Sequence, residues 1–210
     1  MKNLKNTREV IAHTAHFVSG KTLDFGAGSA KYRNLIVPHT SEYITFDMIK
    51  GTNIDVVGDA LNPPFPNNHF DTVISTQVLE HVEKPWIMVS EIGRILKPGG
   101  VCIITAPFMA PYHADPHDFF RFTIEGLASL FVNNEFEIIE HDSYGKIFSV
   151  LSEMIHFMFF SPYRRSTKRR DLWGGRIMRR VESLAYLLDK SLKNKIIYPN
   201  GYVVARKKRT

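Results

Sequence analysis

The chain has 210 residues and a formal net charge of +6, with 44% hydrophobic and 23% charged residues. A chain of this length and composition forms a globular domain that buries a core without a disulfide or metal. Its one cysteine, Cys102, excludes an internal disulfide and a four-cysteine zinc site. The first ten residues contain no apolar run typical of a signal peptide, and no stretch reaches the roughly 18 apolar residues of a membrane span. We therefore expect a cytoplasmic protein.

The positive charge is concentrated in two segments. Residues 164–180 contain eight basic residues and one acid, and residues 206–209 read RKKR. The rest of the chain is mildly acidic. This distribution makes a nucleic-acid-coating protein an unfavoured interpretation, because such proteins are basic over a whole face.

Strands and helices are predicted to alternate along most of the chain. An amphipathic helix is predicted over 7–18, and Pro98-Gly99-Gly100 is expected to end a later one. The predicted strands span 21–25, 42–48, 54–57, 70–76, 101–108, 135–143 and 202–208, and further helices span 85–97 and 123–131. This alternation predicts an α/β fold, a doubly wound and mostly parallel sheet with helices on both faces.

Nearly 60 residues separate the last two predicted strands, too many for a structureless loop. They contain an apolar helical stretch at 147–160 and a second helical pattern. The second pattern places Ile177, Val181, Leu184 and Leu188 on one face. We interpret the chain as one domain with a helical insertion. Its parts are an N-terminal helix at 1–20, a ligand-binding core at 21–143, the basic insertion at 144–198, and the last strand with a basic tail at 199–210.

The segment LDFGAGSAKY, residues 23–32, predicts a strand followed by a tight glycine turn. Glycines let the backbone approach a ligand closely, although such turns also occur without a ligand. Two acids strengthen the ligand interpretation. Asp47 ends the second strand, where a carboxylate can bind ribose hydroxyls, and Asp59 follows the third strand, where it can accept from an adenine amino group. The pattern indicates a nucleoside site.

A wider set of motifs resembles a known family. LDFGAG, GDA, PFPNNHFD, LEHV and E-x-x-R-x-LKPGG are together similar to class I S-adenosylmethionine-dependent methyltransferases, which have a Rossmann-like fold. The resemblance is closest to the ubiquinone and menaquinone biosynthesis group and covers residues 21–108, about 40% of the chain. It implies S-adenosyl-L-methionine as cofactor and a seven-stranded sheet whose last strand is antiparallel.

The resemblance also implies roles for individual residues. Asp24, Gly26 and Gly28 would bind the methionine part, and Asp47 the ribose. Asp59 and Ala60 would flank the adenine, and Thr76 and Gln77 would line the cofactor floor. Ala30 departs from the pattern, since many members have a third glycine there. A nicotinamide dehydrogenase is disfavoured, because the chain lacks a second nucleotide-binding half.

Residues 106–123, APFMAPYHADPHDFFRFT, follow the fifth strand and should lie over the ligand crevice. A hydroxyl acceptor needs a base, most often a histidine or a carboxylate, and this segment concentrates His113, Asp115, His117, Asp118 and Arg121 among prolines. The alternative is that Asp118 and Arg121 pair structurally while the histidines are only exposed. His113, His117 and Asp118 also suggest a metal set, but we predict no metal. His81, in LEHV, is either a substrate contact or has no chemical role.

HADPHDFFRFT further resembles a subset of methyltransferases from bacterial surface-polysaccharide clusters. This resemblance implies a glycan hydroxyl as acceptor, with His113 or His117 as the general base and Arg121 as a substrate contact. The primary interpretation is O-methylation of a glycan or lipid-linked intermediate. A quinone-type or other small aromatic acceptor is the alternative within the enzyme class. An RNA-binding protein and a non-catalytic cofactor-binding partner subunit remain alternatives from other classes.

The insertion suggests where the protein acts. Its first helix carries Ser149, Ser152, Glu153 and His156 in one narrow stripe and is otherwise apolar, and the basic segment with Trp173 follows directly. An apolar helix beside clustered arginines is typical of membrane interfaces. We therefore expect peripheral membrane contact through residues 147–180, at the inner face. Packing against the sheet or a dimer partner is the alternative.

Overall fold

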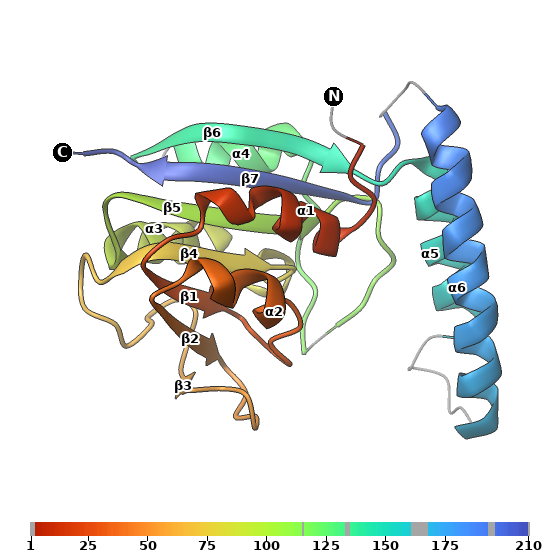
Figure 1. Ribbon diagram of the computed structural model, residues 1–210, viewed down its shortest axis with the longest axis horizontal. Coiled ribbons are helices and arrows are strands. Elements are labelled where there is room, and N and C mark those ends of the chain that lie inside the picture. Colours follow the sequence, from red (N-terminus) through yellow and green to blue (C-terminus); the bar gives the residue numbers. More distant parts are fainter. Residues whose placement is uncertain (1–2, 115, 133–134, 161–167, 193–195, 210) are drawn as a thin grey trace.

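The computed structural model describes residues 3–114, 116–132, 135–160, 168–192 and 196–209, without the side chains of 159, 160 and 168–177. Its centre is a seven-stranded sheet in the order β3-β2-β1-β4-β5-β7-β6 (Figure 1). The strands are β1 (Lys21–Phe25), β2 (Glu42–Asp47), β3 (Val56–Val57), β4 (Phe70–Thr76), β5 (Leu96–Pro107), β6 (Phe136–Tyr144) and β7 (Asn200–Lys207). The pairs among β1 to β5 are parallel, and β7 is antiparallel to both β5 and β6. The predicted fold class is confirmed.

Helices cover both faces of the sheet, as Figure 1 shows. The short helices are η1 (Ala15–Phe17), α2 (Arg33–Ile36), η2 (Val37–His39) and η3 (Leu79–His81), and the longer ones are α1 (Thr7–Thr14), α3 (Pro85–Ile95) and α4 (Ile124–Val132). Val10 and Ile11 of α1 pack with Ile36 of α2 in one buried cluster. Met88 of α3 and Leu127 of α4 belong to a second cluster that includes Leu23 and Val73 of the sheet. Each face therefore has its own apolar core.

Local side-chain bonds set several element ends. Asn6 caps α1 by accepting from the Glu9 amide at 3.0 Å, and Thr123 caps α4 by accepting from the Gly126 amide at 3.0 Å. The strand predicted at 54–57 is reduced to β3. Asp55, at its start, instead accepts from the Thr45 amide and hydroxyl at 2.9 and 2.8 Å.

The end of α3 differs from the prediction. The helix ends at Ile95, and β5 already begins at Leu96, so Pro98-Gly99-Gly100 lies within the strand rather than before it. Pro98 has no amide hydrogen to continue a helix, and Gly99 has a φ of 81°. The register between β4 and β5 shifts between Phe70 and Thr72, beside this kink. The Pro-Gly-Gly segment therefore acts as an irregularity at a strand entrance.

The predicted insertion forms two long helices, α5 (Ile147–Phe160) and α6 (Lys168–Ser191), which lie side by side at one end of the sheet (Figure 1). Among the described residues, no helix is both long and apolar enough to cross a membrane. The basic residues Arg164 and Arg165 lie outside the described part of the chain, and the side chain of Trp173 is not described.

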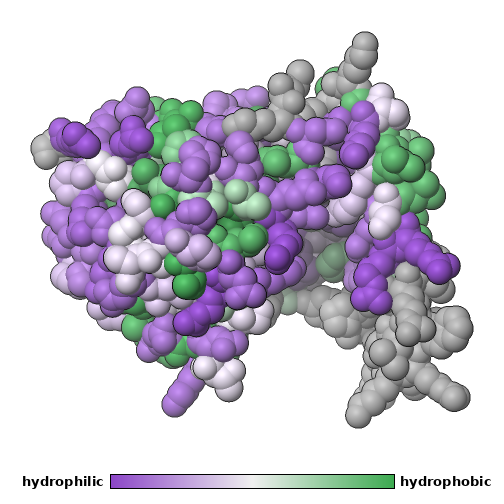
Figure 2. Space-filling model, viewed as in Figure 1, coloured by the Kyte–Doolittle hydropathy of each residue, from purple (hydrophilic) through white to green (hydrophobic). Residues whose placement is uncertain are grey.

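The polar stripe of α5 faces inward. Ser149 and Ser152 are 4% and 5% exposed, whereas Met154 and Met158 are 42% and 64% exposed. The helix pair therefore turns apolar side chains toward solvent, and Figure 2 shows hydrophobic residues gathered on its outer side. The exposed apolar set is Leu151, Met154, Ile155 and Met158 of α5 with Leu184, Leu187 and Leu188 of α6, called here the apolar outer face.

Candidate active site

A cavity of about 560 Å³ opens at the carboxyl ends of β1, β2 and β4. This is the edge where parallel α/β sheets bind ligands, and the volume suits a nucleoside-sized molecule. Seven of the eight predicted cofactor residues line it: Asp24, Gly26, Gly28, Asp47, Ala60, Thr76 and Gln77. Their contacts with a ligand stay predictions.

The glycine turn is shaped by its contacts with β2 and with Val78, which follows β4. Gly26 has a φ of 76°, and a Cβ there would clash with the side chain of Val78. Gly28 has a φ of 52° and open space where its Cβ would be. Ala30 has a φ of 53°, a left-handed conformation that favours the glycine expected there and costs alanine about 1 kcal/mol. The turn thus leaves free volume beside the backbone at Gly28.

Asp24, on β1, is a buried carboxylate at the inner wall of the cavity. It is 5% exposed and accepts a 2.5 Å hydrogen bond from the Tyr43 hydroxyl. Burial raises the pKa of Asp24 to about 6, the Tyr43 hydrogen bond lowers it, and the charge of Asp47 raises it further. A carboxylate held at such a cost favours a cationic group of a ligand beside it.

The buried charge of Asp24 predicts that the stability of the ligand-free protein depends on pH. Because the pKa of the folded carboxyl is raised, stability falls as pH rises from about 4 to 6 and stays reduced above that. Asp24→Asn keeps an acceptor for Tyr43 and removes the buried charge. We expect this variant to have a free energy of unfolding about 2 kcal/mol above the parent's at pH 8 and close to the parent's at pH 4. Urea denaturation at both pH values measures this.

Asp55→Asn is the matched control with the opposite sign. Hydrogen bonds from Thr45 lower the pKa of Asp55, so its charge stabilises the folded state at neutral pH. This variant should lose stability at pH 8 and approach the parent at low pH. A stability of Asp24→Asn that is equal to the parent's at pH 8 would contradict the assignment of a buried charge at this position.

The remaining predicted cofactor residues occupy distinct places. Asp47 accepts from the Gly28 amide at 2.9 Å and from the Ile49 amide at 3.0 Å, so it joins the glycine turn to the end of β2. Gln77 has a φ of 56° and donates to the Thr105 hydroxyl at 3.0 Å, which fixes its side chain at the cavity floor. Asp59 is exposed and accepts a hydrogen bond from the Leu61 amide. It is not a lining residue itself but directly precedes Ala60, which is one.

Sequence reasoning missed several lining residues, among them Met48 and Ile49. Met48 and Ile49 are 60% and 58% exposed, follow Asp47 directly, and line the cavity. Apolar side chains at an exposed position offer a surface for a flat ring. Two apolar residues directly after a strand-ending acid are the signal that could have identified them.

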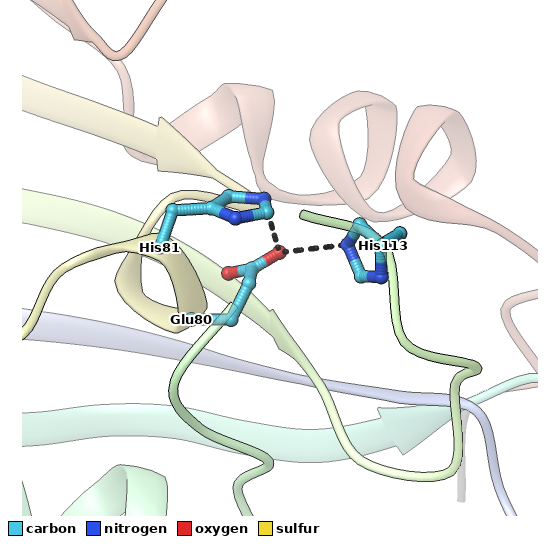
Figure 3. Close-up of side chains that lie close together, drawn as sticks. All are labelled: Glu80, His81 and His113. Atoms are coloured by element: carbon cyan, nitrogen blue, oxygen red, sulfur yellow. Dashed lines mark ion pairs between the residues drawn. The ribbon is translucent and has the colours of Figure 1, made fainter. Parts of the chain in front are cut away.

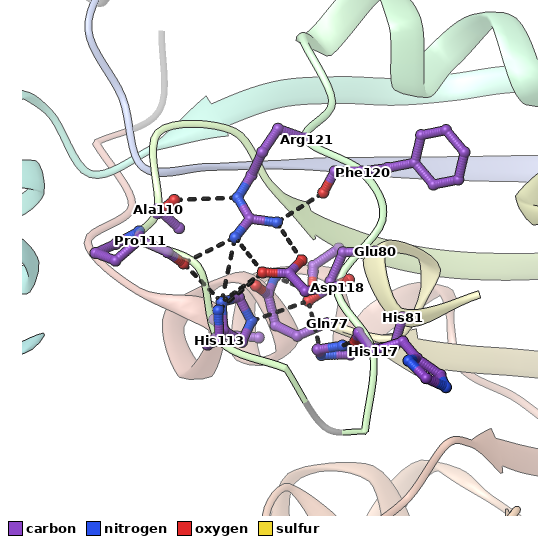
Figure 4. A network of polar contacts seen from close by, with 12 residues as sticks. Gln77, Glu80, His81, Ala110, Pro111, His113, His117, Asp118, Phe120 and Arg121 are labelled. Carbon is purple, nitrogen blue, oxygen red and sulfur yellow. Dashed lines mark hydrogen bonds and ion pairs between the residues drawn. The ribbon is translucent and has the colours of Figure 1, made fainter. Parts of the chain in front are cut away.

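The loop after β5 is held by Arg121, as Figure 4 shows. The guanidinium donates to both carboxylate oxygens of Asp118, at 2.5 and 2.7 Å. Its other N–H groups donate to the carbonyls of Ala110, Pro111 and Phe120. All five N–H donors are therefore used inside the loop. Arg121 thus forms the structural pair with Asp118 that the alternative describes, and its contact with a substrate stays a prediction.

The two candidate bases lie in different surroundings. His117 is exposed, and its ring lies 5.4 Å from that of Phe119. His113 is half-buried, and its Nε2 lies 3.8 Å from Oε1 of Glu80. Glu80 raises the pKa of His113, and burial opposes that shift. The structure thus brings His113, and not His117, into contact with a buried carboxylate.

Glu80, His81 and His113 form a compact cluster at the rim of the cavity (Figure 3). His81 lines the cavity, and its Nε2 lies 3.7 Å from Oε1 of Glu80. Glu80 is 0% exposed. The sequence motif LEHV identified His81 but gave no sign that its neighbour Glu80 is buried.

Comparison with known proteins adds the following. Residues 23–104 match a family model described as a methyltransferase domain. The chain is 28% identical over 162 residues to the demethylmenaquinone methyltransferase of Staphylococcus saprophyticus, covering 67% of this chain and 70% of that protein. Several other curated methyltransferases match over less than half of their own length.

Solved structures share the fold at low identity. Phosphoethanolamine N-methyltransferase 2 of Haemonchus contortus, solved with S-adenosyl-L-methionine, aligns with a TM-score of 0.58 and 17% identity over 91% of this chain and 49% of that one. A [4+2]-cyclase aligns with a TM-score of 0.63 and 18% identity over 97% and 80%. The second likeness shows that the fold by itself does not determine the reaction.

Proposed function

We propose that the chain is a class I S-adenosylmethionine-dependent methyltransferase and that it methylates a hydroxyl group of a glycan or of a lipid-linked intermediate. The observation that carries this proposal is the position of the polar cluster. His81 lines the cofactor cavity and also contacts Glu80, which in turn contacts His113 on the loop after β5. Side chains of types that can bind and deprotonate a hydroxyl thus adjoin the cavity, which supports the proposal.

The cavity suits the cofactor's chemistry. Methyl transfer from a sulfonium is a direct displacement, so the protein mainly aligns the acceptor, methyl carbon and sulfur. When bound, the cofactor supplies the electrophilic methyl group. Asp24 offers a buried carboxylate to the cationic part of the cofactor, and Asp47 offers one to its ribose. The open space at Gly28 lets the cofactor approach the backbone closely.

Exposed aromatic side chains surround the loop and support an acceptor with a ring. Tyr112 is 70% exposed, Trp86 50% and Phe119 46%. Sugars and quinones both pack against such rings. The demethylmenaquinone relative favours a quinone-type acceptor as the second candidate.

The test uses S-adenosylmethionine labelled in the methyl group. The protein is incubated with the labelled cofactor and with glycan, lipid-extract and RNA fractions of a bacterial lysate. Label in a glycan or glycolipid that resists mild acid and base indicates an ether and supports the proposal. Label on a quinone ring carbon supports the second candidate. Cofactor binding with no label transfer to any fraction supports a non-catalytic partner subunit, and salt-sensitive RNA binding supports the RNA interpretation.

Asp47 provides a prediction for the cofactor half. Asp47→Ala should weaken S-adenosylmethionine binding about 10- to 100-fold, because a carboxylate-to-hydroxyl bond contributes about 1.5–3 kcal/mol. Asp47→Asn retains one acceptor and should lose less. Glu137→Ala is the matched control, because this exposed carboxylate lies on β6, outside the lining. Calorimetric titration measures all three, and an unchanged affinity for Asp47→Ala would contradict the ribose assignment.

A lipid-linked acceptor requires access to a membrane, and we propose that the α5–α6 pair supplies it. The apolar outer face points to solvent. Arg179 and Arg180 are exposed residues of α6, the helix that also supplies the leucines of this face. Phe157 of α5 lies 6.2 Å from the His113 ring, so this helix also adjoins the loop. An apolar face with flanking arginines is typical of binding to anionic lipid.

The membrane proposal predicts a preference among vesicles. The protein should co-sediment with phosphatidylglycerol vesicles more than with phosphatidylcholine vesicles, and salt should weaken the difference. Arg179→Gln with Arg180→Gln should reduce binding about 30-fold, at about 1 kcal/mol per residue. Arg206→Gln with Lys208→Gln is the control, because these exposed residues lie at the opposite end of the molecule (Figure 1). Equal sedimentation with and without vesicles would contradict the proposal and favour a protein partner.

A further inference from the structure

We propose that Glu80, His81 and His113 bind one divalent transition-metal ion at the rim of the cofactor cavity. Glu80 and His81 come from η3, and His113 comes from the loop after β5, so the site joins two segments far apart in the sequence (Figure 3). One potential ligand atom from each residue lies within 4.8 Å of the other two. This set differs from the one suggested by the sequence, which included His117 and Asp118.

Glu80 gives the first argument. Its side chain is 0% exposed, and neither carboxylate oxygen has a hydrogen-bond partner in the part of the chain that the structure describes. A buried carboxylate without partners is strongly unfavourable unless a positive charge lies beside it. Arg121 contributes only at longer range, because its N–H groups are used inside the loop.

The distances give the second argument. Oε1 of Glu80 lies 3.7 Å from Nε2 of His81 and 3.8 Å from Nε2 of His113. These separations are too long for hydrogen bonds. Two ligands of one zinc-sized ion, each bound at about 2.0–2.2 Å, lie about 3–4 Å apart. The gap therefore fits a shared cation better than direct pairing.

The outer ring nitrogens give the third argument. Nδ1 of His81 lies 2.5 Å from the His117 carbonyl oxygen, and Nδ1 of His113 lies 2.9 Å from the Pro111 carbonyl oxygen. A carbonyl only accepts, so each of these contacts places the hydrogen on Nδ1. For His113 the 2.9 Å contact with Pro111 is shorter than the 3.4 Å approach of the Arg121 Nη2, which would need Nδ1 as acceptor, so we assign the hydrogen to Nδ1. In the neutral rings Nε2 of each histidine then carries the lone pair. Metal-binding histidines are commonly oriented by this backbone contact. Three acceptors that face one another call for a cation between them.

The ligand types indicate which ions fit. Two imidazoles and one carboxylate suit Zn²⁺, Fe²⁺, Mn²⁺ or Co²⁺ more than Mg²⁺, which prefers oxygen ligands. Three protein ligands would leave coordination positions open, and His81 lines the cavity, so a bound ion would lie at the cavity rim. If the proposed methyl transfer holds, a hydroxyl acceptor would be bound there.

The experiment is a metal titration of the full chain without a histidine tag, after chelator treatment and dialysis. Co²⁺ is followed by its visible absorption, and Zn²⁺ by calorimetry and thermal denaturation. We expect one equivalent to bind and to raise the melting temperature. Glu80→Gln, His81→Ala and His113→Ala should each weaken binding at least tenfold. His39→Ala, which removes an exposed histidine elsewhere, should bind like the parent.

The outcomes separate this proposal from the proposed function. Absence of Co²⁺ and Zn²⁺ binding by the parent, or parent-like binding by all three ligand variants, overturns the metal site. A rise in the melting temperature of Glu80→Gln without metal, together with no metal binding by the parent, would identify the cluster as an ion pair of Glu80 with protonated His113. S-adenosylmethionine affinity of the parent, Glu80→Gln and His113→Ala reports folding and the cofactor site independently, because Glu80 and His113 lie outside the cavity lining.

Discussion

Replacing His113 with alanine is expected to lower kcat for methyl transfer by about 10²–10⁴-fold, with S-adenosylmethionine affinity unchanged. The ring adjoins Glu80 and His81 at the cavity rim but is not part of the cavity lining around Asp24 and Asp47. Its loss removes either a base or a metal ligand, and both act on the acceptor rather than the cofactor. The rate is measured with labelled cofactor and the acceptor fraction that becomes labelled.

His117→Ala is the matched control on the same loop. Its ring is exposed and contacts Phe119 rather than Glu80, so we expect kcat within a few-fold of the parent. The backbone carbonyl that His81 contacts remains in this variant. A fall in kcat that occurs only in His117→Ala would assign the catalytic role to His117 instead of His113. Full activity in both variants and in the double variant would remove chemistry from the loop.

The cofactor half was predictable because its signals are local. A strand, a glycine turn and a strand-ending acid lie within a short stretch, and parallel pairing brings such ends to one edge of the sheet. The seven predicted strands all occur, with β1 and β4 at their predicted bounds. Two elements differ from their predicted bounds for local reasons. Pro98 lies within β5, which begins earlier than predicted, and β3 is short because Asp55 accepts a hydrogen bond from the Thr45 amide.

The acceptor half was less predictable because its chemistry depends on burial and on long-range contacts. The sequence shows Arg121 as a free cation near two histidines, yet Asp118 and three backbone carbonyls take up all of its donors. It shows Glu80 as an ordinary acid beside His81, yet Glu80 is fully buried. Periodicity identifies neither fact, because both are set by how the loop returns over η3.

The insertion illustrates the same limit for a helix. The 3.6-residue period located the polar stripe of α5 correctly, but not the direction in which it points. That direction is set by Asp189 of α6, about 40 residues away in sequence. Its carboxylate accepts from the amides of Lys146, Phe148 and Ser149 at 3.0–3.1 Å and from the Ser149 hydroxyl at 2.6 Å. An acid from one helix thus caps the start of the other.

Replacing Asp189 with alanine is therefore expected to cost about 3 kcal/mol of stability in the α5–α6 pair. Asp189 is 5% exposed, and the variant leaves three amides and a hydroxyl at the start of α5 without their acceptor in a buried place. Asp189→Asn keeps one carbonyl oxygen and should lose about half as much. Lys190→Ala, at the neighbouring exposed position, is the control and should stay within about 0.5 kcal/mol.

Hydrogen exchange shows where the Asp189→Ala loss falls. The amides of α5 and α6 should exchange faster, whereas those of β1, β4 and β5 should keep the parent's protection, because the sheet cores contain no residue of the α5–α6 pair. S-adenosylmethionine affinity should stay at the parent's value while vesicle binding falls, since the cavity belongs to the sheet and the apolar outer face belongs to the helices. Unchanged exchange in α5 and α6 would contradict the capping role. A matching loss of cofactor affinity would mean that the helix pair and the sheet unfold as one unit.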